Sequence, residues 1–82
     1  MRVQALFFAV TRDLAGVGEA TVEVPGDAPT VADFVHAVEA AYPGLAGRMG
    51  SVRIARNERF TALDVALAEG DVLALVPPVS GG

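Results

Sequence analysis

The sequence contains neither cysteine nor lysine, and it has a single histidine. Without cysteine, the chain cannot form a disulfide, a thiolate metal site or a cysteine nucleophile. All six basic residues are arginines, so the chain offers no side-chain amine for acylation. Any covalent chemistry must therefore use another group of the chain.

Long apolar runs and an excess of positive charge are also missing. No run reaches the roughly 20 apolar residues that a membrane-spanning helix needs. The short apolar run near the start alternates as a strand does and lacks the cleavage site of a signal peptide. A net charge of −4 disfavours binding to nucleic acid. We therefore expect a small cytoplasmic protein that binds neither nucleic acid nor membrane.

Hydrophobic alternation predicts strands near both ends of the chain. Residues 2–9 and 19–24 read as two strands paired in a hairpin, and residues 52–56 and 71–76 as two more. In the first strand, apolar residues occupy both faces, which is typical of a central strand. The segment 57–67 fits no single element.

A helix is predicted between these strands. Thr30 and Asp33 form a capping-box pattern at its start, and Pro43 and Gly44 end it. Its apolar stripe consists of Val31, Phe34, Val35, Val38 and Tyr42. A shorter helix is expected between the first two strands, with Thr11 as its N-cap and Gly16 as its stop. The fold class is therefore α+β, with a mixed sheet that has one main helix on one face.

No internal residue stands out as catalytic. His36 lies off the apolar stripe and is expected to be solvated. Three carboxylates near the end are too loosely grouped for a metal or acid–base site: Asp64, Glu69 and Asp71. The arginines at 53, 56 and 59 suggest a solvated strand edge or, less simply, a docking patch for an acidic partner. A free-standing enzyme is thus the least favoured class, and no metal site is expected.

The last six residues are the candidate site. We expect a folded domain over residues 1–76 and an extended tail over residues 77–82. The tail consists of Pro77, Pro78, Val79, Ser80, Gly81 and Gly82. The two prolines stop the sheet and stiffen the exit of the chain, whereas glycines lack a Cβ and can enter a narrow channel. The Gly82 carboxylate would then sit at the tip of a slim arm; the alternative is an inert, disordered tail.

The stretches "LFFAVTRDLAG" and "AEGDVLALVPPVSGG", together with a length near eighty residues, closely resemble the small subunits of molybdopterin synthase. This family consists of ubiquitin-like sulfur carriers, and the resemblance covers the whole chain. It implies a β-grasp fold with the first and last strands adjacent at the sheet centre, and a flexible Gly-Gly tail.

The resemblance also implies a mechanism. An E1-like adenylyltransferase would use ATP to adenylate Gly82, and a sulfur donor protein would convert the adenylate to a thiocarboxylate. The tail would then insert into the large subunit of a heterotetrameric synthase, which holds the catalytic residues. There the sulfur would pass to cyclic pyranopterin monophosphate and form the molybdopterin dithiolene. The resemblance implies no cofactor bound to the carrier itself.

Partner-facing residues follow from the same resemblance. It places Phe8, Phe60 and Val76 at the interfaces with the large subunit and the activating enzyme. Arg12 would pair with an acidic partner residue, although solvation at a helix start explains it nearly as well. The alternative for the three apolar residues is that they fill a thin core. Arg56 departs from the family pattern, which commonly has an apolar residue there.

Three other functions stay open from sequence. The chain could carry sulfur for another pathway, such as thiamine synthesis, or it could be a protein-modifying relative. It could also be a ubiquitin-like interaction module whose tail is inert. These alternatives differ in the partners of the chain and in whether the two terminal glycines are needed.

Overall fold

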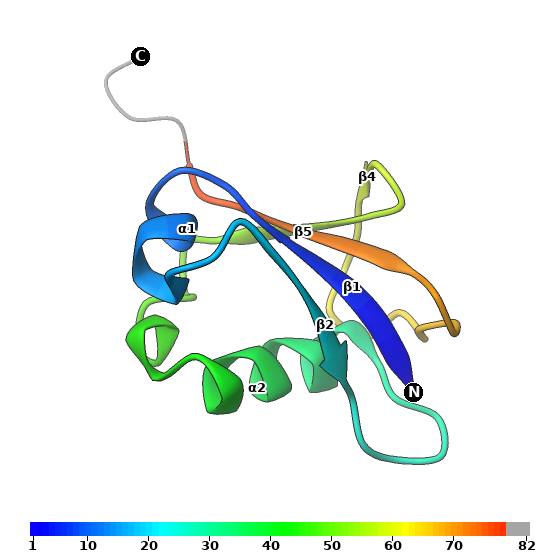
Figure 1. The fold of residues 1–82 in the computed structure, drawn as a ribbon. Coiled ribbons are helices and arrows are strands. Elements are labelled where there is room, and N and C mark those ends of the chain that lie inside the picture. The colour runs from blue at the N-terminus through cyan, green and yellow to red at the C-terminus, as the bar shows by residue number, and fades with distance from the viewer. Residues whose placement is uncertain (79–82) are drawn as a thin grey trace.

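The computed structural model describes residues 1–78, which form one mixed sheet, two α-helices and a 3-10 helix. The elements in chain order are β1 (Arg2–Phe7), α1 (Val10–Ala15), β2 (Glu19–Glu23), α2 (Val31–Ala41), η1 (Pro43–Leu45), β3 (Arg53–Arg56), β4 (Arg59–Phe60) and β5 (Val72–Val76). The strand order across the sheet is β2-β1-β5-β3-β4. The predicted α+β class is therefore confirmed (Figure 1).

The two strands at the ends of the described chain lie side by side in the middle of the sheet. β1 pairs antiparallel with β2 and parallel with β5, and β5 pairs antiparallel with β3. The face of β1 toward α2 is buried, whereas Gln4 and Leu6 on the other face are half-buried. The predicted adjacency of the first and last strands is confirmed.

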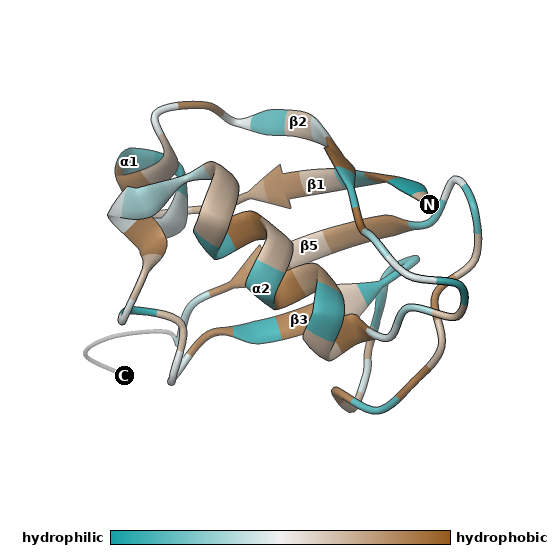
Figure 2. Ribbon diagram, turned by 90° about the horizontal axis from the view of Figure 1, so that it is seen from below, coloured by the Kyte–Doolittle hydropathy of each residue, from teal (hydrophilic) through white to brown (hydrophobic). Residues whose placement is uncertain are grey.

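The helix α2 covers one face of this sheet, as the view from the helix side shows (Figure 2). The predicted capping box is present: the Asp33 amide donates to Thr30 Oγ1, and the Thr30 amide donates to Asp33 Oδ2. Tyr42 follows the last turn, and its ring packs edge-on against Phe7 with centroids 5.3 Å apart. The core between helix and sheet consists of Val3, Ala5, Phe7, Val22, Val24, Val31, Phe34, Val38, Leu45, Ile54, Leu67, Leu73 and Leu75.

The short helix α1 begins differently from the prediction. Ala9 is its N-cap residue and makes no side-chain cap hydrogen bond, so the assignment of Thr11 as N-cap is wrong. Thr11 lies inside the helix and is buried, because its hydroxyl turns back to the backbone of Phe8. The helix ends at Gly16, which has a φ of 84° and so adopts the left-handed conformation that glycine favours. This stop is as predicted.

The segment left unassigned from sequence has little regular structure. Only the two residues of β4 pair with β3, after a turn in which Asn57 and Glu58 have positive φ angles of 50° and 74°. Farther along, the carbonyl groups of Leu63 and Val65 accept hydrogen bonds from the first amides of α2. The first amides of a helix have no partner within it, so this irregular segment satisfies them from outside.

No helix among residues 1–78 is both long and apolar enough to span a bilayer.

Candidate functional site

An apolar row crosses the sheet face opposite α2. The strand registers place Leu6 of β1 beside Ala74 of β5, Ala74 beside Ala55 of β3, and Ala55 beside Phe60 of β4. Residues paired in this way point to the same side of a sheet, and the core residues of β1 and β5 alternate to the other side. The two alanines have small side chains and lie between the larger side chains at either end of the row. We call this set of four residues the open-face row.

Phe8 and Val76 extend this face toward the end of the sheet where β5 finishes. Phe8 directly follows β1 and is 49% exposed, and Phe60 is 54% exposed. Val76, the last residue of β5, is half-buried. The alternative that these three residues fill a thin core is therefore wrong for both phenylalanines. Exposed aromatic side chains beside an apolar row are typical of a binding surface.

Thr11 fixes the geometry of this end of the sheet. Its Oγ1 atom accepts a hydrogen bond of 2.9 Å from the Phe8 amide and donates one of 2.7 Å to the Phe8 carbonyl oxygen. The same hydroxyl lies 3.4 Å from the carbonyl oxygen of Leu75. This buried hydroxyl thus lies between the residue after β1 and the end of β5. The sequence suggested a capping role for Thr11 and gave no sign of this link.

Arg12 and Phe8 lie next to each other. The resemblance implies that both face a partner, and this stays a prediction. The two residues line a shallow hollow together with Leu6 and Val17. The guanidinium rests against Gly18, where an added Cβ would come within 3.4 Å of Arg12 Nε. Arg12 is exposed and forms no salt bridge within residues 1–78. It therefore presents a positive charge at the edge of the open face.

The three arginines suggested as one patch have separate roles. Strand β3 lies between β5 and β4, so the interpretation as a solvated sheet edge is wrong for Arg53 and Arg56. The Arg53 guanidinium carbon lies 3.8 Å from the centre of the Phe60 ring. Arg56 instead pairs with Asp71. The register places Arg53 beside Val76 on the open face. Period-2 alternation with the core residue Ile54 could have predicted this position.

Asp71 is a structural carboxylate. It is buried and accepts hydrogen bonds from Arg56 Nε at 2.7 Å, from the Ala68 amide at 2.7 Å and from Asn57 Nδ2 at 3.0 Å. Burial by itself raises the pKa of this carboxyl, but these hydrogen bonds and the Arg56 charge hold the pKa below its ordinary value. Every oxygen of Asp71 is engaged, which suits a role in holding the turn before β5.

The other polar candidates are not brought together. Glu69 accepts a hydrogen bond from the Arg2 amide, and Asp64 and His36 are exposed. Within residues 1–78, no group of three His, Asp or Glu side chains is placed to hold a metal ion. Among these residues, the apolar face of the sheet is therefore the feature best suited to binding another surface.

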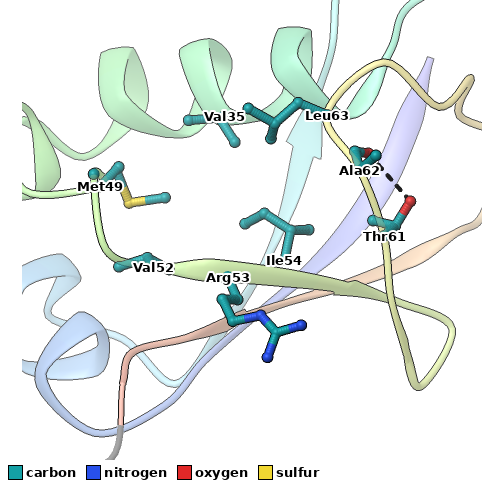
Figure 3. Close-up of a pocket in the computed structure, with 9 residues that line it drawn as sticks. Val35, Met49, Val52, Arg53, Ile54, Thr61, Ala62 and Leu63 are labelled. Carbon is teal, nitrogen blue, oxygen red and sulfur yellow. Dashed lines mark hydrogen bonds between the residues drawn. The ribbon is translucent and has the colours of Figure 1, made fainter.

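A second hollow lies between α2 and β3, away from the open face. Its volume is about 340 Å³, and it is lined mainly by apolar side chains, among them Val35, Met49 and Leu63. Figure 3 shows Ile54 pointing toward the helix and Arg53 pointing away from the hollow. The sequence did not predict this hollow, because it is formed by segments distant in sequence.

The predicted tail is only partly covered by the structure. β5 ends at Val76, Pro77 is half-buried, and Pro78 is exposed. Val79, Ser80, Gly81 and Gly82 lie outside the described residues, so their predicted roles are not tested by the structure. What the structure does show is that the strand leading to them borders the open face.

A mixed sheet with parallel central strands and one crossing helix defines a ubiquitin-like β-grasp protein. The solved structure of SAMP1 from Haloferax volcanii has this fold: its TM-score is 0.90 at 37% identity, and the match covers 100% of both chains. Subunit 1 in a complex of subunits 1 and 2 of molybdopterin-converting factor from Helicobacter pylori is also similar. It matches with a TM-score of 0.69 at 28% identity over 100% of both chains.

The chain belongs to the ThiS family, whose model matches residues 5–82. Among curated proteins, it is 37% identical to a molybdopterin synthase sulfur carrier subunit of Chlamydomonas reinhardtii over 100% of both chains. It is also 41% identical to small archaeal modifier protein 1 of Haloferax volcanii, over 92% of this chain and 94% of that protein. The resemblance inferred from the end motifs is thus confirmed at the level of the family.

Proposed function

We propose that this chain is the sulfur-carrier subunit of a molybdopterin synthase and that Gly82 carries the sulfur. The observation that carries the proposal is the open-face row, which crosses the strand leading to the Gly-Gly sequence. The full-length similarity to a sulfur carrier subunit of this synthase supports the choice of pathway. On this proposal the chain is a subunit and co-substrate, and the catalytic residues belong to the large subunit.

The chemistry begins with a carboxylate, which is a poor electrophile until one oxygen becomes a good leaving group. An E1-like enzyme supplies this step when the Gly82 carboxylate attacks the α-phosphorus of ATP and pyrophosphate leaves. A sulfur donor then displaces AMP, and the product is a thiocarboxylate. This group is nucleophilic through sulfur, as a thiolate is. Because the chain has no cysteine, it is also the one thiolate-like group that the chain could present.

Transfer requires the tail to reach the substrate inside the large subunit. The open-face row, Phe8 and Val76 would contact the large subunit while the tail enters its active site. There the thiocarboxylate sulfur bonds to a carbon of cyclic pyranopterin monophosphate as a carbon–oxygen bond of the substrate breaks, and water then cleaves the resulting thioester and restores the Gly82 carboxylate. A dithiolene contains two sulfur atoms, so two thiocarboxylates must each deliver one. The complex of subunits 1 and 2 from Helicobacter pylori supports this mode of assembly.

The test is a reconstituted synthase that contains the large subunit, the activating enzyme, a sulfur donor, ATP and cyclic pyranopterin monophosphate. We expect molybdopterin with the natural chain and none after deletion of Gly82 or addition of one alanine beyond it. Both variants alter only the tip of the tail, so each should keep the thermal unfolding midpoint of the natural chain. Full activity of either variant would refute the proposed role of Gly82.

A second candidate function is supported by the relatives named as archaeal modifiers, which match at 41% identity in sequence and a TM-score of 0.90 in structure. In that case the activated Gly82 would form an amide bond with a lysine of another protein. The two functions share adenylation and differ in the acceptor. Conjugates that resist thiols and contain this chain joined to lysine, without sulfur transfer to the pterin, would favour the modifier.

A further inference from the structure

Arg53 occupies an unusual place for a charged residue. It sits on the open face, in register with Val76 on one side. On the other side, its guanidinium stacks on Phe60, with 3.8 Å between the guanidinium carbon and the ring centre. A positive charge therefore lies between two of the apolar residues that are expected to be covered by a partner. From sequence, Arg53 belongs to a cluster of three arginines that indicates a solvated strand edge or, less simply, a docking patch for an acidic partner.

Two other arginines of the sheet are paired with carboxylates within the described residues, whereas Arg53 is not. Arg2 pairs with Glu23, and Arg56 pairs with Asp71. Within residues 1–78, Arg53 forms no salt bridge. Water solvates the exposed guanidinium in the free chain. A partner that covers Val76 and Phe60 must remove much of this water, and a charge left unpaired there would weaken binding.

The stacked geometry determines what can replace the water. A guanidinium that lies against an aromatic ring uses its flat side for the ring and keeps its N–H donors free at the edge of the plane. Two of these donors match the two oxygens of a carboxylate. The Phe60 ring thus positions the Arg53 guanidinium before an acidic side chain binds. Because Arg53 is already held, it loses less rotamer freedom on binding.

We propose that Arg53, positioned by Phe60, recognises an acidic side chain on the large subunit of the synthase. This inference rests on the proposed function, because that function supplies the partner. It adds a second charged contact to the one expected for Arg12, and it places this contact between the apolar residues Val76 and Phe60. Such a contact selects the correct partner, since a neutral or basic residue opposite Arg53 would leave its charge unpaired.

The first experiment measures the affinity of the purified large subunit for the full-length chain and two variants. Arg53→Gln removes the charge at the proposed contact. Arg59→Gln is the matched control, because Arg59 is exposed on the neighbouring strand and pairs in register with Arg56, away from the open face. We expect about tenfold or greater weakening for Arg53→Gln, and less than about twofold for Arg59→Gln.

Salt and a lysine variant make the test more specific. The natural chain should bind more weakly as ionic strength rises, and this dependence should be smaller for Arg53→Gln. Arg53→Lys keeps the charge but loses the planar stacked donors, so it should recover only part of the lost affinity. In a Phe60→Leu background, Arg53→Gln should have a smaller effect, because the ring that positions the guanidinium is gone.

Charge reversal identifies the partner residue. Arg53→Glu should weaken binding more than Arg53→Gln, and one acidic residue of the large subunit should restore binding when it is replaced by lysine. If the natural chain binds the large subunit and Arg53→Gln binds equally well, this inference is wrong while the proposed function stands. The same holds if no acidic position gives rescue. If the natural chain does not bind the large subunit at all, the proposed function fails and this inference fails with it.

Discussion

The Arg56 Nε atom donates a hydrogen bond of 2.7 Å to the Asp71 carboxylate, and this pair joins β3 to the start of β5. Asp71 is 6% exposed, and the Arg56 side chain is 32% exposed, so the pair is shielded on the carboxylate side. The same carboxylate holds the turn at Ala68 and the side chain of Asn57. A single buried acid thus fixes the register of the strand that leads to the proposed tail.

Replacing Asp71 should therefore destabilise the fold more than replacing a neighbouring exposed acid. We expect Asp71→Asn to lower the free energy of unfolding by about 2 kcal/mol, because Arg56 loses its ion pair and a buried acceptor is lost. Glu69→Gln should change it by less than about 0.5 kcal/mol, since Glu69 is exposed. Urea unfolding of the three proteins measures both values. Equal effects of the two substitutions would contradict this account.

The stability of the fold should also depend on pH through Asp71. Its pKa is lowered in the folded state, so its contribution is complete above the unfolded pKa of about 3.9. This contribution decreases as pH falls from that value through the lower folded pKa. We expect the free energy of unfolding to fall more steeply with acid in the natural chain than in Asp71→Asn. Parallel curves between about pH 2 and 5 would show that Asp71 has no shifted pKa.

The backbone at Ala9 offers a stabilising substitution. Ala9 has a φ of 53° and a ψ of −128°, which is a region that glycine adopts much more readily than alanine. Ala9→Gly should raise the free energy of unfolding by about 1 kcal/mol. Ala32→Gly, inside α2, is the control and should lower it by about 1 kcal/mol. Thermal or urea unfolding tests this pair, and destabilisation by both would show that Ala9 is not strained.

The small size of the two alanines in the open-face row should matter for binding and not for folding. Ala74→Leu places a larger side chain in the middle of the row. We expect it to weaken binding to the large subunit by about tenfold or more, because the added side chain would occupy the space of a partner side chain. Ala40→Leu, on the exposed side of α2, is the control and should bind as the natural chain does. Calorimetric titration measures the difference. Unchanged binding by Ala74→Leu would place the interface elsewhere.

Much of the fold could be predicted from local patterns. Alternation located the hairpin strands, the capping box located the start of α2, and the glycine at 16 located the end of α1. Thr11 was misplaced because a threonine before a helical turn fits an N-cap, whereas its hydroxyl bonds to Phe8 and approaches Leu75. The segment 57–67 fits no local pattern, because hydrogen bonds between its later part and the first amides of α2 determine its path.

The site could be predicted less completely. The family resemblance indicated Phe8, Phe60, Val76 and Arg12, and the structure places these residues at or beside the open face. The two alanines of the open-face row were missed, because their place beside Leu6 and Phe60 depends on the register of several strands, which sequence alone does not give. Arg53 was grouped with Arg56 and Arg59, although alternation with the core residue Ile54 indicates that it lies on the other face.

The central claim is that Gly82 carries sulfur, and mass spectrometry of the intact chain tests it most directly. The chain is incubated with the activating enzyme, ATP and a sulfur source, and a parallel sample omits ATP. We expect the complete reaction to replace one oxygen atom with sulfur at Gly82, located by fragmentation of the terminal peptide, and the sample without ATP to keep its carboxylate. A plain carboxylate in the complete reaction, with an enzyme that activates a known carrier, would contradict the account.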